Sequence, residues 1–378
     1  MTEPVLTPWE VRGKIDYDKL IKEFGTSPIS KQLLSRLSQK SELPALLRRG
    51  LYFSHRDLNL VLDDYDKGKG FFLYTGRAPS GPMHIGHLLS FEITKWFQQA
   101  FGANVYIQIP DEEKFLAKRD LTMEETDRWR EDNLLEIAAM GFDPDKTFMF
   151  CNRAYSGKLF EPACRIAKKV TFSTAKAVFG FTNESNIGWI FYPAMQIVPT
   201  FFEKRRCLIP SAIDQDPYWR IQRDIAESFG YFKTSAIHSK FFPPLEGAEG
   251  KMSSSEAKSA ILLSDSESEV KNKINKYAFS GGRPTIEEHR KLGADLSIDV
   301  PYQWLYYFFE PDDGKMNEIT RAYSSGEMLT GEIKKILIGR INSYLSSHQK
   351  SKAKAKKALS EITETGSLAR KMADWKMK

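Results

Sequence analysis

The sequence predicts an α/β fold with a parallel sheet, followed by a region made only of helices. An apolar strand turns into an amphipathic helix within residues 71–102, and a second strand follows directly at 105–109. Strand, helix and strand in this order form the crossover unit of a Rossmann-type sheet. A second strand-to-helix junction occupies residues 207–217, whereas from Ser264 onward helical patterns alternate with polar turns.

The first junction combines three features that favour anion binding. Residues 71–74 read Phe-Phe-Leu-Tyr, which is typical of a buried strand. The chain then turns through glycines and prolines between residues 76 and 82, and apolar positions continue at helical spacing to Gly102. At such a junction the free amides and the dipole of the helix point at the ligand, which favours an anion there.

Two histidines, His84 and His87, begin this helix three residues apart and therefore share one face. Gly86 lies between them without a side chain, so a flat ligand can approach the backbone closely. A strand-to-helix turn with two surface histidines explains an isolated His-x-Gly-His equally well. Far downstream, residues 247–255 (the lysine loop, GAEGKMSSS) surround Lys251 with small and polar residues, which on its own is consistent with a linker.

Polar residues mark the end of the next strand, 105–109. Gln108 stands among apolar residues there. Parallel strands are usually apolar on both faces, so a buried amide at this position requires hydrogen-bond partners. Residues 111–114 (DEEK) follow directly, at the edge where open α/β sheets bind ligands.

Further elements follow in order. Thr122 and Glu125 form a capping box, which predicts a helix running to Gly141. Residues 147–150 predict a short strand, and a long helical region extends from there through Val178.

The second junction carries more polar residues than helix capping requires. Residues 191–199 precede it and are apolar around the single amide of Gln196. The strand at 207–213 is followed by Asp214, Gln215, Asp216 and Pro217. An N-cap aspartate and a proline at the first helical position explain Asp216 and Pro217, but not Asp214 or Gln215.

Residues 1–70 predict an accessory segment rich in helix. The pattern from Asp16 to Phe24 is helical and ends at Gly25, and residues 46–57 lead into a second helix.

The carboxyl-terminal region predicts helices separated by a break at 280–284 and a buried turn at 305–309. An amphipathic helix begins near Gly331, and the lysines between Lys350 and Lys357 predict a solvated face.

Composition sets broad limits. A chain of 378 residues with 41% hydrophobic content can build two domains. The net charge of +6 is compatible with a polyanionic partner without proving one. The three isolated cysteines suggest neither a zinc site nor a disulfide framework, which favours a reducing compartment. Since the sequence has no signal-peptide core and no apolar run long enough for a membrane, we expect a cytoplasmic protein without a membrane partner.

The two junction segments together resemble the paired signatures of class I aminoacyl-tRNA synthetases. Met83-His84-Ile85-Gly86-His87 is similar to the HIGH signature, and residues 251–255 (KMSSS) are similar to KMSKS. Ser254 replaces the second lysine of KMSKS, which removes one possible phosphate contact but keeps Lys251.

Six further segments resemble tryptophanyl-tRNA synthetases of the eukaryotic cytoplasmic type. These segments are 8–11 (PWEV), 73–77 (LYTGR), 111–114 (DEEK), 179–182 (FGFT), 212–217 (AIDQDP) and 278–283 (AFSGGR). They occur in the same order and span nearly the whole chain, so they are more specific than either signature alone.

This resemblance implies a tryptophan–tRNA ligase that works in two steps. Tryptophan and Mg-ATP first give tryptophanyl-adenylate and pyrophosphate, and the tryptophanyl group then passes to the terminal adenosine of tRNA(Trp). The tryptophan carboxylate itself attacks the α-phosphate, so the protein supplies position and charge. Mg²⁺ arrives with ATP, and the sequence shows no dedicated cage for a metal and suggests no other cofactor.

The resemblance also implies roles for individual residues. His84 and His87 suit the charge that develops on the α-phosphate, and Lys251 suits the pyrophosphate. Further ATP contacts are expected from Thr75, Gly76, Arg77, Gly86, Lys114, Asp214, Gln215, Met252 and Ser253. Indole has one hydrogen-bond donor. The tryptophan contacts are expected to be Tyr74 and Gln108 at the indole N–H, and Glu113 and Gln196 at the ammonium group.

The domain organisation follows from the same resemblance. We expect an N-terminal extension packed on the catalytic body (1–70), a Rossmann-type catalytic domain with a dimer-interface insertion (71–262), an α-helical anticodon-binding domain (263–361) and a C-terminal tail (362–378). A homodimer is implied. Arg283 matches an anticodon contact of the family, although the next residue is Pro284, where relatives usually carry an acidic residue.

Three alternatives are less consistent with the sequence. A tyrosyl-tRNA synthetase shares the architecture, but segments 111–114 and 179–182 disfavour it. A P-loop ATPase would need a glycine at Leu245 and a serine or threonine after Lys251. An RNA-binding or signalling protein without catalysis would not need both histidines and Lys251.

Overall fold

The computed structural model describes residues 5–6, 11–12, 15–247, 250, 252 and 260–377. Within them, a mixed sheet has the strand order β3-β4-β9-β8-β5-β6-β7, and β1 pairs with β2 in a separate hairpin. The strands are β1 (Val5–Leu6), β2 (Val11–Arg12), β3 (Ser27–Pro28), β4 (Tyr52–Arg56), β5 (Phe71–Gly76), β6 (Asn104–Ile109), β7 (Thr147–Cys151), β8 (Arg206–Ala212) and β9 (Ser235–Ser239).

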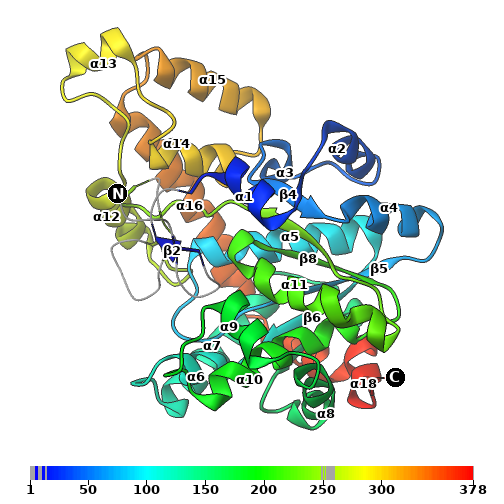
Figure 1. Cartoon of the computed structure of the whole chain (residues 1–378). Helices are drawn as coiled ribbons and strands as arrows, with labels where there is room; N and C mark the ends of the chain where they lie inside the picture. Colours follow the sequence, from blue (N-terminus) through cyan, green and yellow to red (C-terminus); the bar gives the residue numbers. More distant parts are fainter. Residues whose placement is uncertain are drawn as a thin grey trace.

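Helices cover this sheet and continue beyond it (Figure 1). They are α1 (Tyr17–Phe24), α2 (Lys31–Ser38), α3 (Ala45–Arg48), α4 (Leu58–Asp66), α5 (Ile85–Phe101), α6 (Glu113–Ala117), α7 (Met123–Ala138), α8 (Ser156–Ala167), α9 (Phe172–Phe179), α10 (Ile187–Ile197), α11 (Asp216–Ile225), α12 (Glu267–Tyr277), α13 (Ile286–Leu292), α14 (Val300–Trp304), α15 (Asp313–Ser324), α16 (Thr330–Lys352), α17 (Lys356–Ser360) and α18 (Ser367–Ala373). None of these helices is long and apolar enough to cross a membrane.

Five neighbouring strands, β9-β8-β5-β6-β7, are parallel. The chain passes from β5 outward through β6 to β7, and then returns to the other side of β5 for β8 and β9. This reversal places a crevice at the carboxyl ends of β5 and β8, which is where doubly wound sheets bind ligands.

The parallel strands are buried on both faces. Phe71 and Leu73 of β5 belong to one hydrophobic cluster, whereas Phe72 and Tyr74 belong to the other. The alternation follows from the two-residue period of a strand. It confirms the predicted Rossmann-type sheet, with helices on both sides.

Local sequence explains several of the element ends. Thr122 and Glu125 make the predicted capping box of α7, which ends at Ala138, before Gly141. Asp16 accepts from the first backbone amides of α1, and Gly25 ends that helix in the left-handed region, at φ 61°.

Residues 1–70 contain α1 to α4, in agreement with the helix-rich prediction, but they also contribute β3 and β4 to the main sheet, which was not predicted. Strand β4 pairs antiparallel with β9. Its Arg56 donates two hydrogen bonds to the Asp216 carboxylate, at 2.6 and 2.7 Å. Asp216 is fully buried and is the first residue of α11, so the prediction that it is the N-cap is wrong; Gln215 holds that position.

Two further predictions need correction. The helical region before Val178 is divided into α8 and α9, which are separated by residues 168–171. Residues 305–309 form a π-helical turn in which Leu305 and Phe309 are buried but the middle residues are only partly so.

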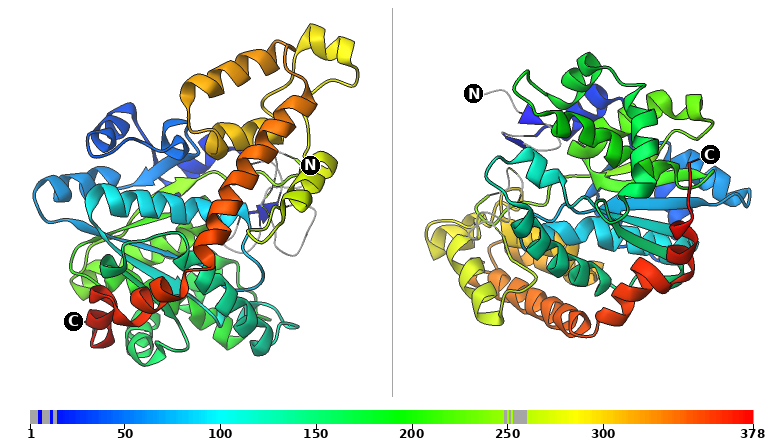
Figure 2. Two further views of the ribbon diagram at one scale, coloured as in Figure 1. Left: turned by 180° about the vertical axis from the view of Figure 1, so that it is seen from behind. Right: turned by 90° about the horizontal axis from the view of Figure 1, so that it is seen from below.

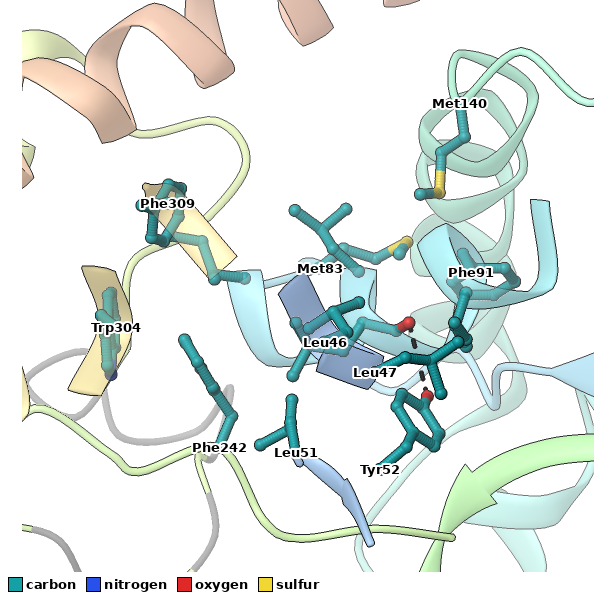
Figure 3. Packing of buried hydrophobic residues seen from close by; sticks show 14 of the residues in the cluster. Leu46, Leu47, Leu51, Tyr52, Met83, Phe91, Met140, Phe242, Trp304 and Phe309 are labelled. Carbon is teal, nitrogen blue, oxygen red and sulfur yellow. Dashed lines mark hydrogen bonds between the residues drawn. The ribbon is translucent and has the colours of Figure 1, made fainter. Parts of the chain in front are cut away.

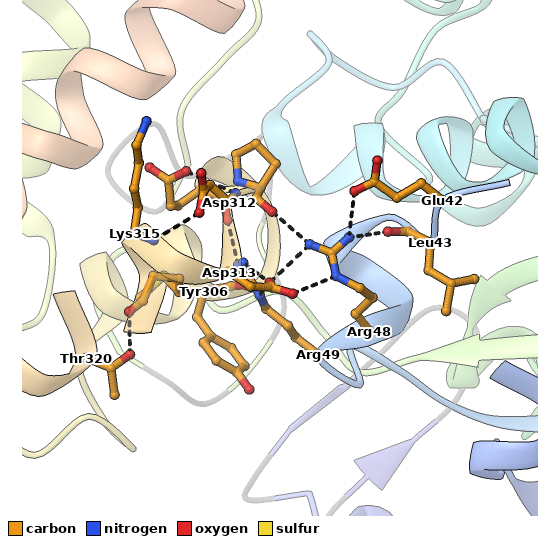
Figure 4. A network of polar contacts seen from close by, with 12 residues as sticks. Glu42, Leu43, Arg48, Arg49, Tyr306, Asp312, Asp313, Lys315 and Thr320 are labelled. Carbon is orange, nitrogen blue, oxygen red and sulfur yellow. Dashed lines mark hydrogen bonds and ion pairs between the residues drawn. The ribbon is translucent and has the colours of Figure 1, made fainter. Parts of the chain in front are cut away.

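The carboxyl-terminal helices pack on the N-terminal segment as well as on one another. Figure 3 shows one apolar part of this contact, and its labelled members include Leu46, Leu51, Phe242, Trp304 and Phe309. Beside it, Arg48 and Arg49 of the α3 region both pair with Asp313 of α15, and Arg49 also donates to the carbonyl of Glu310 at 2.6 Å (Figure 4). This charged group lowers the pKa of Asp313 to about 2.

Helix α16 joins the helical region to the parallel sheet. Figure 2 shows it running along the back of the molecule toward the C-terminus. Tyr344 donates to Glu92 of α5 at 2.8 Å, and Lys352 donates to both Asp132 and Glu136 of α7 at 2.6 Å. At least one member of the predicted solvated lysine run is therefore paired across an interface.

Residues 362–377 also pack on the body. Leu368, Ala369 and Met372 of α18 are buried with the cluster that covers Phe148 and Phe150 of β7. Strand β7 is the edge of the sheet, and covering an edge prevents pairing with another chain.

The Arg56–Asp216 pair predicts a pH-dependent contribution to stability. Burial disfavours the charge on Asp216, but the hydrogen bonds from Arg56 and the nearby imidazole of His238, whose Nε2 lies 3.4 Å from Asp216 Oδ1, outweigh it and lower the pKa from 3.8 to about 2. Such a shift corresponds to about 2 kcal/mol of stability, fully present above the unfolded pKa and lost as the pH falls from about 4 toward 2.

We therefore expect Asp216→Asn to lower the free energy of unfolding by about 2 kcal/mol at pH 7, and the difference from wild type to narrow below about pH 4. Urea unfolding between pH 3 and 7 measures this. Asp224→Asn, at an exposed position of the same helix, is the control. A constant difference between wild type and Asp216→Asn across this range would contradict the assignment.

Candidate active site

The crevice between β5 and β8 brings together most of the predicted site residues. Tyr74, Thr75 and Gly76 end β5, and Gln108 lies beside Gly76 in the register of β5 and β6. A β-carbon at Gly76 would lie 2.6 Å from the carbonyl oxygen of Gln108, so only glycine fits this close approach.

The two histidines lie at the start of α5. His84 is buried at the N-cap position, and its backbone N–H donates to His87 Nδ1 at 3.1 Å. The two rings stack with centroids 3.6 Å apart. Because the helix dipole and the imidazoles act at the same point, this end of α5 suits negative charge.

The two signature segments meet in the fold. A β-carbon at Gly86 would lie 3.2 Å from the sulfur of Met252, which is buried. Lys251 and Ser253 lie outside the described residues, as do Pro8, Trp9 and Glu10.

Residues 261–263 connect the carboxyl side of the lysine loop to the histidines. The Ile85 N–H donates to the carbonyl of Ile261 at 3.0 Å, and the Leu263 N–H donates to the carbonyl of Met83 at 2.9 Å. His84 and Leu262 form an antiparallel bridge between these bonds.

Asp265 and Lys273 hold this connection in place. Asp265 Oδ2 accepts from the Leu262 N–H at 2.9 Å and from Lys273 Nζ at 2.6 Å. Lys273 also donates to the carbonyl of Ala260 at 3.3 Å. Neither residue was singled out from the sequence, because both act on backbone groups and carry no recognisable motif.

Arg77 lies in the turn after β5, and its side chain is partly buried. Its backbone N–H donates to the carbonyl of Gln108 at 3.0 Å, while Nε and Nη2 are buried with no hydrogen-bond partner. Burial lowers the pKa of the guanidinium to about 10. A buried cation with two unused donors is costly without an anion, so this position favours a negatively charged ligand.

Tyr74 and Gln108 form a buried pair facing α10. The Tyr74 hydroxyl contacts Gln108 Oε1 and lies 3.0 Å from the carbonyl oxygen of Gln196. Burial raises the pKa of Tyr74 well above its usual value, so the hydroxyl stays neutral. The partners that Gln108 requires therefore exist.

Two residues that the sequence analysis did not assign complete this polar chain. Gln108 Nε2 donates to Asn152 Oδ1 at 2.8 Å, and Asn152 Nδ2 donates to Glu112 Oε1 at 2.7 Å. Burial, with Asp111 and Glu113 nearby, raises the pKa of Glu112 to about 7, against the effect of its hydrogen bonds.

Glu113 and Gln196 are brought together by Tyr192. Its hydroxyl lies 3.2 Å from Glu113 Oε2 and also contacts Gln196 Oε1. Tyr192 and Gln196 are one helical turn apart on α10, a spacing that the sequence offered as a signal. Lys114 donates to Glu113 Oε1 at 2.8 Å, so it lies by this carboxylate.

At the second junction, Asp214 is buried and Gln215 precedes α11. Burial raises the pKa of Tyr17 of α1 to about 12, and the charge of Asp214 adds to this rise. The Phe241 N–H donates to the Tyr17 hydroxyl at 3.0 Å. The N-terminal segment therefore contributes to the surroundings of this junction.

Arg283 lies apart from this crevice. It is exposed on the loop between α12 and α13, and its Nε donates to the carbonyl of Gly293 at 3.0 Å. No group of three or more histidine, cysteine, aspartate or glutamate side chains suited to a metal occurs among the described residues.

Comparisons with known proteins agree with this geometry. Residues 66–370 match the family model of class I tRNA synthetases (W and Y). Two curated relatives are tryptophan–tRNA ligases: one from Saccharolobus solfataricus is 56% identical over 98% of both chains, and one from Pyrococcus furiosus is 57% identical over 96% of this chain and 95% of its own.

A solved structure of tryptophanyl-tRNA synthetase from Giardia lamblia is also similar. It is 39% identical, has a TM-score of 0.88, and the match covers 92% of this chain and 95% of that one. The similarity thus extends to archaeal as well as eukaryotic members. At this identity and coverage, the chain belongs to the tryptophanyl-tRNA synthetase family of class I aminoacyl-tRNA ligases.

Proposed function

We propose that this chain activates L-tryptophan with ATP in the crevice between β5 and β8 and then transfers the tryptophanyl group to tRNA(Trp). One observation carries the assignment of the site. A buried hydroxyl and amide oxygen, from Tyr74 and Gln108, lie on the same side of the sheet as the Glu113–Tyr192–Gln196 cluster. The first pair suits an indole N–H, and the cluster suits an ammonium group.

ATP then lies toward the start of α5. Arg77 has two buried donors without a partner, and the imidazoles of His84 and His87 stack at the start of α5. Both features favour the negative charge of a phosphate group. The tryptophan carboxylate attacks the α-phosphorus, and pyrophosphate leaves with the electron pair of the broken P–O bond. Lys251 neutralises the leaving pyrophosphate.

We propose the remaining ATP contacts from the same arrangement of residues. Thr75 and Gly76 present the end of β5, Gly86 and Met252 lie together under the histidines, and Asp214 and Gln215 suit the ribose. Lys114 is paired with Glu113, and its contact with ATP remains part of the proposal. Ser253 keeps its proposed contact with ATP. Mg²⁺ would enter with ATP, held by the phosphates rather than by a protein cage, and would offset their negative charge.

Residues 263–361 read the anticodon in this proposal, and residues 71–262 contain the reaction site. The exposed guanidinium of Arg283 supports this division, since it adjoins α13 at the end of the molecule away from α8 and α10 (Figure 1). Free cysteines are consistent with a cytoplasmic location.

A homodimer is supported by an apolar surface on α8, α9 and α10. Phe160, Phe172 and Ile187 are 62%, 44% and 86% exposed. Phe172, Ile187 and Phe191 line a groove of about 230 Å³, and Phe160 contacts Phe191 with ring centroids 6.4 Å apart. Contiguous exposed apolar residues of this kind mark interaction surfaces, and a second copy of this chain is the proposed occupant.

Two variants separate the proposed steps. Lys251→Ala should lower the rate of adenylate formation by about 10²–10³, because one contact to developing charge is lost. Arg283→Ala should spare this step and weaken only the charging of tRNA(Trp). Tryptophan-dependent exchange of labelled pyrophosphate into ATP measures the first step, and charging measures both.

Each variant is the control for the other. If wild type shows no tryptophan-dependent exchange, the proposed function is wrong. Unchanged single-turnover activation in Lys251→Ala would remove that lysine from the mechanism, and equal losses in both assays for Arg283→Ala would remove its anticodon role.

Substitutions at two isoleucines that each begin a helix, Ile187 and Ile286, test the proposed dimer. Ile187→Glu should shift the protein to monomers, because it places a charge in the apolar surface. Ile286→Glu, at a 65% exposed position at the start of α13, should leave the dimer intact. Sedimentation velocity at micromolar concentration distinguishes these outcomes; a monomeric wild type, or equal behaviour of both variants, would contradict the proposal.

A further inference from the structure

We infer that Asn152 and Glu112 are positioning residues that set amino-acid selectivity by fixing which end of the Gln108 amide faces the indole. The inference rests on the proposed function and deepens it. It concerns side chains that touch Gln108 directly or through one neighbour, rather than the substrate itself.

Both amide hydrogens of Gln108 are used away from Tyr74. Nε2 donates to Asn152 Oδ1 at 2.8 Å and to the carbonyl of Met195 at 3.3 Å. Gln108 is fully buried, so water cannot replace these partners. The oxygen Oε1 is therefore directed to the Tyr74 hydroxyl.

The side-chain oxygen of Asn152 faces Gln108 because its side-chain nitrogen donates a hydrogen bond to Glu112. Asn152 Nδ2 donates to Glu112 Oε1 at 2.7 Å, and Asn152 is 1% exposed. Its backbone N–H donates to the carbonyl of Ile109 at 3.0 Å, which fixes the residue beside the end of β6. A flipped Asn152 amide would face Gln108 with donors and Glu112 with an acceptor, and both bonds would be lost.

The end of the proposed pocket at Tyr74 and Gln108 therefore offers hydrogen-bond acceptors to a ligand. A hydroxyl has one hydrogen, which Tyr74 can give to the carbonyl of Gln196, 3.0 Å away. When it does so, the lone pairs of the Tyr74 oxygen and of Gln108 Oε1 are left for a ligand donor. Such a wall favours an indole N–H over a ring that carries sulfur or oxygen at the same position, because the latter leaves the acceptors without a partner.

The test compares L-tryptophan with β-(3-benzothienyl)-L-alanine, in which sulfur replaces the indole N–H. We expect Asn152→Ala to reduce the preference for tryptophan roughly tenfold, because the Gln108 amide is no longer held in one orientation. The KM for ATP should not change. Calorimetry measures the affinity for both amino acids, and pyrophosphate exchange measures kcat/KM.

Two further variants keep the result specific. Glu112→Gln combined with Asn152→Asp exchanges the amide and the carboxylate, so an acceptor still faces Gln108 Nε2, and the preference should return to near the wild-type value. Asn104→Ala is the matched control: Asn104 lies at the opposite end of β6 and donates to Glu203 at 2.7 Å, so its loss should not alter the preference.

The outcomes are distinct. If Asn152→Ala weakens both amino acids equally, or if Asn104→Ala changes the preference as much, the two residues are merely structural and the inference is overturned. A wild type that binds both amino acids equally also overturns it. A wild type that binds tryptophan selectively but catalyses no exchange contradicts the proposed function, while the binding comparison still decides the inference.

Discussion

The arrangement of the site depends on one buried amide. Gln108 lies between Ile107 and Ile109 of β6 with no exposure to solvent, so each of its amide hydrogens and its oxygen requires a partner within the protein or the ligand. The hydrogens are used by Asn152 and by the backbone of α10, and the oxygen by Tyr74. The hydrogen-bond partners of Gln108 therefore bring the ends of β5, β6 and β7 together with α10. The oxygen lone pairs that these bonds leave unused determine which ligand donor the proposed pocket can bind.

The side of the site where we propose that the phosphates bind is fixed by backbone contacts that join distant parts of the chain. Residues 261–263 pair with the start of α5, and Asp265 with Lys273 holds that pairing. Helix α16 adds a link, since Gln349 donates to the carbonyl of Leu263 at 2.9 Å. The helical region thus contacts the segment that follows the lysine loop, which offers a physical path between the proposed anticodon-reading region and the reaction site.

The sequence predicted those elements whose signals are local. Strand β5, helix α5 and the capping box of α7 follow from period, turn and cap residues, and Gln108 stood out because its neighbours are apolar. Strand β4 was missed because Ser54, His55 and Arg56 are polar. The partners of Ser54 and Arg56, which are His238 and Asp216, lie more than a hundred residues away. Asn152 was not assigned for the same reason, because it acquires its role only when separate strands meet. Tyr192 was also not assigned, although it lies one helical turn before Gln196.

The most direct test of the account is a double-mutant cycle at Tyr74 and Gln108, measured as kcat/KM for tryptophan and for its sulfur analogue. Gln108→Leu should lower the preference for tryptophan roughly tenfold to a hundredfold, because the buried indole N–H loses an acceptor. Tyr74→Phe should also lower the preference for tryptophan. The effect of the double variant on this preference should be smaller than the sum of the two single effects, because the two residues share one ligand donor. If Gln108→Leu weakens both amino acids equally, the indole is not recognised through this amide and the account is contradicted.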